Sequence, residues 1–138
     1  MSENTTNGNC LCKKVTIKVD SIDKNMGACH CSMCLKWGGG PLLALDCKDR
    51  VEFTGVEYIK CYRSSEWAER GFCVECGTHL FYRLIDNNQH IMPAALFDDL
   101  DKVIFDHQIF IDEKPNYYDF ANQTKTMTGK EVFEQFGA

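Results

Sequence analysis

The chain has 138 residues, of which 44% are hydrophobic, and it carries a formal net charge of −5. This length fits one compact domain, so we predict a single domain over residues 1–138. The acidic balance and the lack of a basic stripe argue against a nucleic-acid partner. The N-terminus shows no basic segment followed by an apolar run, and no apolar stretch reaches the length of a membrane span. We therefore expect a cytoplasmic protein without membrane association.

Short strands are expected along the first half of the chain. The alternation of Val15, Ile17 and Val19 predicts a half-buried strand at residues 13–19. Apolar or β-branched segments predict further strands. Gly55 is a turn signal that separates the last two of them. These segments span residues 41–47, 51–53 and 56–62.

The second half continues this pattern. Segments 66–72 and 79–84 flank Cys73-Val74-Glu75-Cys76-Gly77, which predicts a hairpin with a thiol-bearing turn. Two more strands are expected at residues 90–96 and 107–111.

The tail predicts a helix. Thr128 and Glu131 have the spacing of a capping box, and the apolar Val132, Phe133 and Phe136 follow on one face. The expected fold class is therefore mainly β, with a short C-terminal helix.

Cysteine is the most informative residue type. There are nine cysteines, and an odd number cannot pair fully within one chain. Because a reducing compartment also disfavours structural disulfides, metal ligation or thiol chemistry is the natural interpretation. Seven of the nine fall into three groups with short spacings, a C-x-C, a C-x-C-x-x-C and a C-x-x-C followed by Gly77: Cys10 and Cys12; Cys29, Cys31 and Cys34; Cys73 and Cys76.

Seven thiolates divide most simply as four plus three. Zinc takes four ligands in a closed structural site, and it keeps a position open in a catalytic site. The two isolated pairs would then form the structural zinc site: Cys10, Cys12, Cys73 and Cys76. Such a site could contribute on the order of 10 kcal/mol of coupled metal-binding and folding free energy. In an alternative division, the middle group supplies two ligands to a closed site and leaves its third cysteine free.

The middle group of three cysteines is the candidate reaction site. A second zinc on Cys29, Cys31 and Cys34 could accept an external thiol as fourth ligand and hold it as the nucleophilic thiolate. That thiolate could attack a small aldehyde. Two alternatives stay open: a second closed site completed by His30, and a metal-free, redox-sensitive triad.

These motifs resemble those of a known family. The Gly8-Asn9-Cys10-Leu11-Cys12 segment, the Cys29-His30-Cys31-Ser32-Met33-Cys34 segment and the block from Arg70 to Leu80 are similar to the motifs of the glutathione-dependent formaldehyde-activating enzymes. The resemblance extends from about Gly8 to Phe120 and includes the strand that begins at His107. Members often carry a tryptophan shortly after the Lys-Pro dipeptide, where this chain has Tyr117 and Tyr118.

The resemblance implies a β-tent of small antiparallel sheets around a structural zinc, with a core at about residues 8–120. It implies a zinc-dependent carbon–sulfur lyase or synthase, with glutathione as co-substrate and formaldehyde or a related small aldehyde as substrate, that forms S-(hydroxymethyl)glutathione. It also implies that Cys29, Cys31 and Cys34 are the catalytic residues, which hold the second zinc or contact glutathione. A non-catalytic zinc- and thiol-binding module is the alternative function.

Other residues are expected to have structural roles. Cys47 and Cys61 are predicted to pack in buried strands, and Trp67 to anchor the core. His30 is a candidate ligand or proton shuttle, although the pattern slightly favours a solvent-facing loop position. Four cations are candidate partners of glutathione carboxylates, with surface solvation as the default for each: Lys36, Arg63, Arg70 and Arg83.

Overall fold

The computed structural model describes residues 5–136, and the side chain of Phe136 is outside that description. The chain folds into two compact units. Of the described residues, the first unit contains 5–24 and 45–102, and the second contains 25–44 and 103–136. The expectation of one domain over residues 1–138 stays a prediction.

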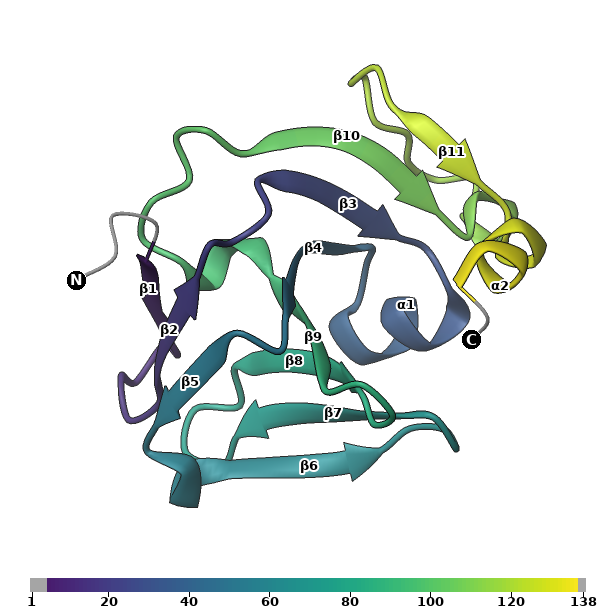
Figure 1. Cartoon of the computed structure of the whole chain (residues 1–138). Helices are drawn as coiled ribbons and strands as arrows, with labels where there is room; N and C mark the ends of the chain where they lie inside the picture. Colours follow the sequence, from purple (N-terminus) through teal and green to yellow (C-terminus); the bar gives the residue numbers. More distant parts are fainter. Residues whose placement is uncertain (1–4, 137–138) are drawn as a thin grey trace. The chain divides into compact units, whose positions relative to one another are not determined.

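The first unit contains two antiparallel arrangements of strands (Figure 1). One has the order β1-β2-β5, with β1 at Thr5–Asn9, β2 at Thr16–Asp20 and β5 at Val51–Thr54. The other has the order β9-β8-β7-β6, with β6 at Ile59–Arg63, β7 at Ala68–Cys73, β8 at His79–Leu84 and β9 at Gln89–Pro93. Single 3-10 turns occupy Val56–Tyr58 and Ala94–Leu96.

The core of this unit follows from the alternation in its strands. Ile17 and Val19 are buried while the residues between and beside them are exposed, as the period of two predicts. Leu45, Leu80 and Met92 are fully buried as well.

The second unit combines a small sheet with two helices. The strand order is β11-β10-β3-β4, with β3 at Asn25–Cys29, β4 at Leu42–Lys48, β10 at Ile104–Ile109 and β11 at Lys125–Met127. Strand β4 begins in this unit, and its residues from 45 onward belong to the first unit. The pairing of β3 with β4 is antiparallel, whereas β10 is parallel to both β3 and β11. Helix α1 spans Ser32–Gly38, a 3-10 turn occupies Ile111–Glu113, and helix α2 spans Gly129–Phe136.

The mainly β fold class and the short C-terminal helix are confirmed. The backbone N–H of Thr128 donates to a Glu131 carboxylate oxygen at 2.9 Å, and Thr128 Oγ1 accepts from the Glu131 N–H at 3.2 Å, as the capping box predicts. The sequence patterns did not predict β1, β3, α1 or β11. The three strands lack a clear alternation and are stabilised by pairing with neighbouring strands, whereas α1 is a short helix capped by Cys31.

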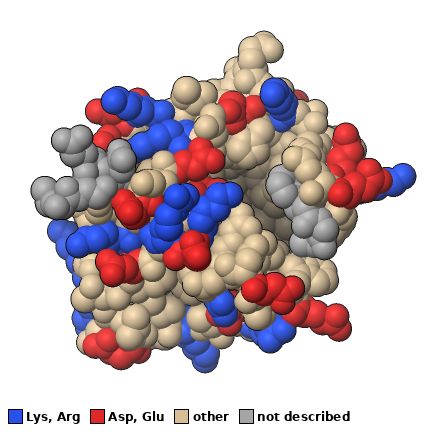
Figure 2. Space-filling view, viewed as in Figure 1, with Lys and Arg blue, Asp and Glu red and all other residues tan. Residues whose placement is uncertain are grey.

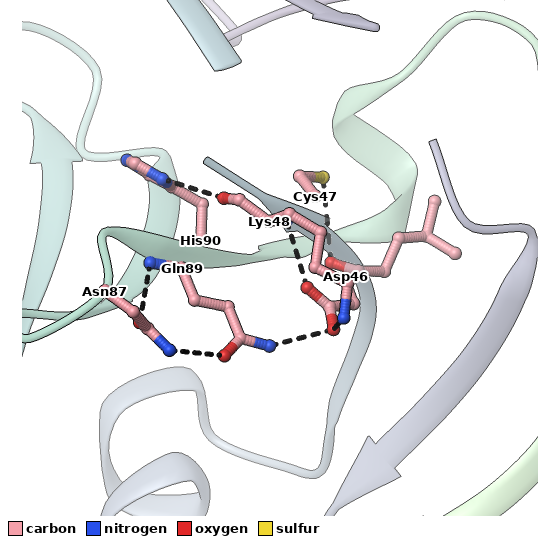
Figure 3. Close-up of polar contacts among 7 residues, drawn as sticks. Asp46, Cys47, Lys48, Asn87, Gln89 and His90 are labelled. Carbon is pink, nitrogen blue, oxygen red and sulfur yellow. Dashed lines mark hydrogen bonds and ion pairs between the residues drawn. The ribbon is translucent and has the colours of Figure 1, made fainter. Parts of the chain in front are cut away.

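The turns at the ends of β4 and β8 are held by polar contacts from β9 (Figure 3). His90 Nδ1 lies 3.3 Å from the carbonyl oxygen of Lys48, which Figure 3 shows. It also lies 2.9 Å from the carbonyl oxygen of Asn88, so it donates to both. Lys48 and Asn88 have positive φ angles of 53° and 57°, which are unfavourable for residues with a side chain. Gln89 Nε2 donates to the Asp46 carboxylate at 2.8 Å. The contacts of β9 therefore stabilise two strained turns.

Three expectations for single residues can be checked. Cys47 is fully buried, as predicted, and burial raises the pKa of its thiol to about 12. Cys61 is exposed, so its predicted burial is wrong; it lies on β6, an outer strand of its sheet. Trp67 is 40% exposed, so its expected role as a core anchor is wrong, and its indole N–H instead donates to the Tyr82 hydroxyl.

Surface charges are mixed on the face that Figure 2 shows, where Lys and Arg side chains lie among Asp and Glu side chains. No helix among residues 5–136 is long and apolar enough to cross a membrane.

Candidate metal centres

Four cysteine sulfurs of the first unit converge on one point. Cys10 and Cys12 follow β1, Cys73 ends β7, and Cys76 lies in the turn before β8. All four Sγ atoms lie within 4.8 Å of one another. The Sγ–Sγ distance is 3.6 Å between Cys10 and Cys12 and 3.7 Å between Cys12 and Cys73. We refer to these residues as the four-cysteine cluster.

Two tight turns present these sulfurs. In the second turn the N–H of Gly77 donates to the carbonyl oxygen of Cys73 at 2.8 Å, and Gly77 has a φ of 77°, which glycine adopts without strain. In the first turn the N–H of Val15 points at Cys10 Sγ, at 3.4 Å. The turns are joined by a hydrogen bond from the Leu11 N–H to Thr78 Oγ1 at 3.1 Å. The local sequence thus shapes each turn, and the contacts between the turns bring the two pairs together.

The geometry of the four-cysteine cluster fits a tetrahedral zinc ion. A Zn–S bond of about 2.3 Å at tetrahedral angles places neighbouring sulfurs about 3.8 Å apart. The measured 3.6 and 3.7 Å agree with this value. A disulfide requires about 2.05 Å, and all nine cysteines are free.

The thiols of this cluster hold their protons unequally. Burial raises the pKa of Cys76, but hydrogen bonds from Thr78 and from the backbone of Cys12 and Thr78 outweigh it and lower that pKa to about 5. For Cys12, the backbone N–H of Lys14 lowers the pKa, but burial and the sulfurs of the other three cysteines together raise it to about 12. Cys76 therefore loses its proton readily, whereas Cys12 holds its proton strongly. A cation that binds the cluster would have to displace the proton of Cys12.

The remaining three clustered cysteines meet at the junction of β3 and α1. Cys29 is the last residue of β3, and Cys31 is the N-cap of α1, where its Sγ accepts from the Cys34 N–H at 3.3 Å. Cys34 is buried on the first turn of the helix. The three Sγ atoms lie within 4.8 Å of one another, and we refer to them as the three-cysteine cluster.

This arrangement fits an open metal site with three thiolate ligands. Hydrogen bonds with Cys31 and Cys34, followed by burial, raise the pKa of the Cys29 thiol. Because ligation requires thiolates, cation binding here would release protons and become stronger as the pH rises. Every ligand comes from one short segment, so the site does not require contacts between distant parts of the chain.

His30 lies between two of these cysteines but is fully buried. Its Nε2 is 2.7 Å from Gln108 Oε1, and its Nδ1 is 2.7 Å from the Tyr118 hydroxyl. Gln108 Nε2 donates to Thr124 Oγ1 at 2.8 Å, so Gln108 Oε1 must accept from His30. We infer that His30 carries its proton on Nε2 and accepts from Tyr118 at Nδ1. The expected solvent-facing position is therefore wrong, and both ring nitrogens are engaged away from the three-cysteine cluster.

A short loop holds Tyr118 in place. Lys114 Nζ forms an ion pair with Asp119 at 2.8 Å and donates to the carbonyl oxygens of Pro115, at 3.0 Å, and Tyr118. The same ammonium group lies 5.0 Å from the centre of the Tyr118 ring. The sequence marks Tyr118 only as a departure from the family motif, and it marks no role for Gln108. No local pattern could identify either residue, because both reach His30 from far along the chain.

The four candidate glutathione-binding cations lie in different surroundings. Arg70 is buried over the ring of Tyr82, and Arg83 forms an ion pair with Glu69 at 2.7 Å. Arg63 donates to the carbonyl oxygens of Ser65 and Glu66. Lys36 is in the last turn of α1, in the same unit as the three-cysteine cluster. Binding of glutathione by any of them stays a prediction.

The fold and the clusters define a mainly β protein with two groups of thiols suited to metal ions. A family model described as "Glutathione-dependent formaldehyde-activating enzyme" matches residues 5–113. The chain belongs to this family, as the resemblance of its motifs indicated.

The chain is also similar to two known proteins, one in sequence and one in fold. The chain is 38% identical over 128 residues to a Schizosaccharomyces pombe protein named "Uncharacterized lyase C29B12.13", covering 92% of this chain and 93% of that protein. A crystal structure of a Rhodobacter sphaeroides protein is similar in fold, with a TM-score of 0.59 and 22% identity, covering 69% of this chain and 90% of the other.

Proposed function

We propose that this protein is a zinc-dependent carbon–sulfur lyase or synthase that joins glutathione to formaldehyde, or to a related small aldehyde. The product with formaldehyde is S-(hydroxymethyl)glutathione. The four-cysteine cluster has a structural role, and the three-cysteine cluster is the reaction site. Nine free cysteines and the family's thiol co-substrate suit a reducing compartment, so we propose the cytoplasm as its location.

The observation that carries the proposal is the three-cysteine cluster of a chain in this family. Three sulfurs from one segment form a set with one tetrahedral position left for a fourth ligand. With zinc bound, that position would accept an external thiol and keep it as the nucleophilic thiolate. The chain positions this set, because the Cys34 N–H donates to Cys31 Sγ and Cys29 is the last residue of β3.

The reaction needs no oxidant or reductant. The sulfur of glutathione forms a bond to the carbonyl carbon, the carbon–oxygen double bond becomes single, and the thiol proton ends on the oxygen. The reverse sequence releases the aldehyde, as expected of a lyase.

The test uses metal content and rate together. We expect about two zinc ions per chain in the wild type and about one in Cys31→Ser, measured by elemental mass spectrometry. Exchange of glutathione and formaldehyde with the adduct, followed by NMR, should be faster with the wild type than without protein. Cys31→Ser should show only the spontaneous rate.

Cys61→Ser is the matched control, because Cys61 is exposed and lies outside both clusters. It should keep both metal ions and the full rate. A wild-type protein with both ions and only the spontaneous rate would refute the enzyme. Saturable glutathione binding by that protein would then favour the alternative function, a non-catalytic thiol-binding module.

A further inference from the structure

A second group of chemically active side chains lies at the start of β3 and in the middle of β10, in the same unit as the three-cysteine cluster. His107 Nδ1 is 2.7 Å from Asp106 Oδ1, and Asn25 Nδ2 donates to the other oxygen of that carboxylate at 2.5 Å. Neighbouring residues of a strand normally point to opposite faces. Here the register of β10 against β3 shifts between Phe105 and His107, and a bulge of this kind re-aims side chains. This irregularity lets Asp106 and His107 contact each other.

The contact determines which nitrogen of His107 is available. The hydrogen bond from His107 lowers the pKa of Asp106, so this carboxylate is ionised and can only accept. Nδ1 therefore carries a proton, and in the neutral ring Nε2 is a bare acceptor. Within residues 5–136, Nε2 has no hydrogen-bond partner. An oriented imidazole with a free Nε2 and a carboxylate behind it is the arrangement of a general base.

Gly27 provides the space that the imidazole occupies. A Cβ atom on Gly27 would lie 2.2 Å from His107 Nε2 and 2.6 Å from Cδ2, so no other residue fits without moving the ring. Gly27 is in the middle of β3, where glycine weakens a strand and typically marks a close approach. The close approach here is that of the His107 ring to the backbone of β3.

The register directs this face of the sheet toward the three-cysteine cluster. His107 pairs with Gly27, and two residues further Ile109 pairs with Cys29. Residues two apart on a strand share a face and lie about 6.6 Å from each other. The imidazole is thus beside Cys29, but its nitrogens are not among the ligand atoms of the cluster.

We propose that His107 is a catalytic residue that transfers the proton between the thiol and the carbonyl oxygen of the substrates. The inference rests on the proposed function. Nε2 takes the proton that the incoming thiol loses as it becomes the thiolate. When the sulfur then bonds to the carbonyl carbon and the carbon–oxygen double bond becomes single, Nε2 gives that proton to the oxygen. Asp106 stabilises the imidazolium formed in between, and Gly27 allows the ring to take its position.

The first test removes and then replaces the base. His107→Ala should lower kcat by about 10²- to 10⁴-fold with little change in KM and with both metal ions retained. Added imidazole should restore part of the rate in His107→Ala. It should leave the wild-type rate unchanged. Cys31→Ser with imidazole should be no faster than the reaction with imidazole and no protein. A purely structural role would not respond to imidazole.

The second test uses Gly27→Ala, which leaves the imidazole in the protein but displaces it. This variant should lower kcat in the wild type and have no further effect in the His107→Ala background. A wild type that catalyses the reaction, together with a fully active His107→Ala, would overturn the inference and leave the proposed function standing. A wild type without catalysis would overturn the proposed function itself. Reduced activity without imidazole rescue, or independent effects of the two variants, would also refute the role of His107.

Discussion

At the scale of single residues, the clearest feature is the full burial of polar groups beside the three-cysteine cluster. His30 is 0% exposed, and each of its ring nitrogens has one partner at 2.7 Å. A buried polar atom without a partner costs about 1–3 kcal/mol. The contacts of His30 therefore stabilise the segment from which Cys29 and Cys31 project.

This argument predicts the effect of two tyrosine substitutions. Tyr118→Phe keeps the ring but leaves His30 Nδ1 without its donor, and we expect it to lower the free energy of unfolding by about 1–3 kcal/mol. Tyr117→Phe is the matched control, because Tyr117 is 80% exposed, and we expect a change of less than about 0.5 kcal/mol. Urea unfolding of the three proteins measures the difference. Equal stability of the two variants would contradict the assigned hydrogen bond.

At the scale of elements, β9 stabilises the turns that follow β4 and β8. His90 donates from Nδ1 to carbonyl oxygens in both turns, and its ring packs against Phe53 and Phe81. Burial lowers the pKa of His90, although the backbone carbonyls partly oppose this effect. The folded protein therefore favours the neutral imidazole.

The direction of this shift predicts how stability depends on pH. The contribution of His90 is fully present above its unfolded pKa of about 6.5, and it is lost as the pH falls from there through the lower folded pKa. His90→Asn can donate to the same carbonyl oxygens but does not titrate. We expect the free energy of unfolding to fall less between pH 7.5 and 5.5 in this variant than in the wild type. The free energy of unfolding is measured by denaturant titration of both proteins at each pH. Loss of metal at low pH would affect both proteins equally, so it cancels in the comparison. An equal decrease in the wild type and in His90→Asn would contradict the prediction.

At the scale of the whole molecule, the four-cysteine cluster connects distant parts of the sequence. Cys12 and Cys73 are 61 positions apart, yet their sulfurs are 3.7 Å from each other. A chain of 138 residues has a limited core, so a metal ion at this point would add considerably to its stability. The three-cysteine cluster, in contrast, lies within one short segment.

We therefore expect the two clusters to respond differently to metal removal. Cys12→Ser changes an exposed thiol and should cost one metal ion and several kcal/mol of stability, out of on the order of 10 kcal/mol coupled to folding. Cys31→Ser should also cost one ion but shift the Tm much less. Thermal unfolding with and without a strong chelator, combined with metal analysis, makes the comparison. Equal Tm values for the two variants would contradict the structural role of the four-cysteine cluster.

The groups of neighbouring cysteines were predictable from the sequence because the residues of each group are close together in the chain. C-x-C and C-x-x-C spacings present two sulfurs from one turn whatever surrounds them, and the structure brings the sulfurs together in the groups of four and three that the spacing suggested. The capping box of α2 and the alternation in β2 were predictable for the same reason. Belonging to the family also follows from these short motifs.

The surroundings of the cysteines were decided by the tertiary structure alone. Gln108 and Tyr118 reach His30 across 78 and 88 positions, and His107 lies over Gly27 only because β10 runs parallel to β3 with one register shift. Register and strand direction depend on the sum of many weak contacts between distant segments, and no local pattern specifies them. The sequence by itself therefore determined which side chains are able to bind metal, while the fold decided which polar groups surround them.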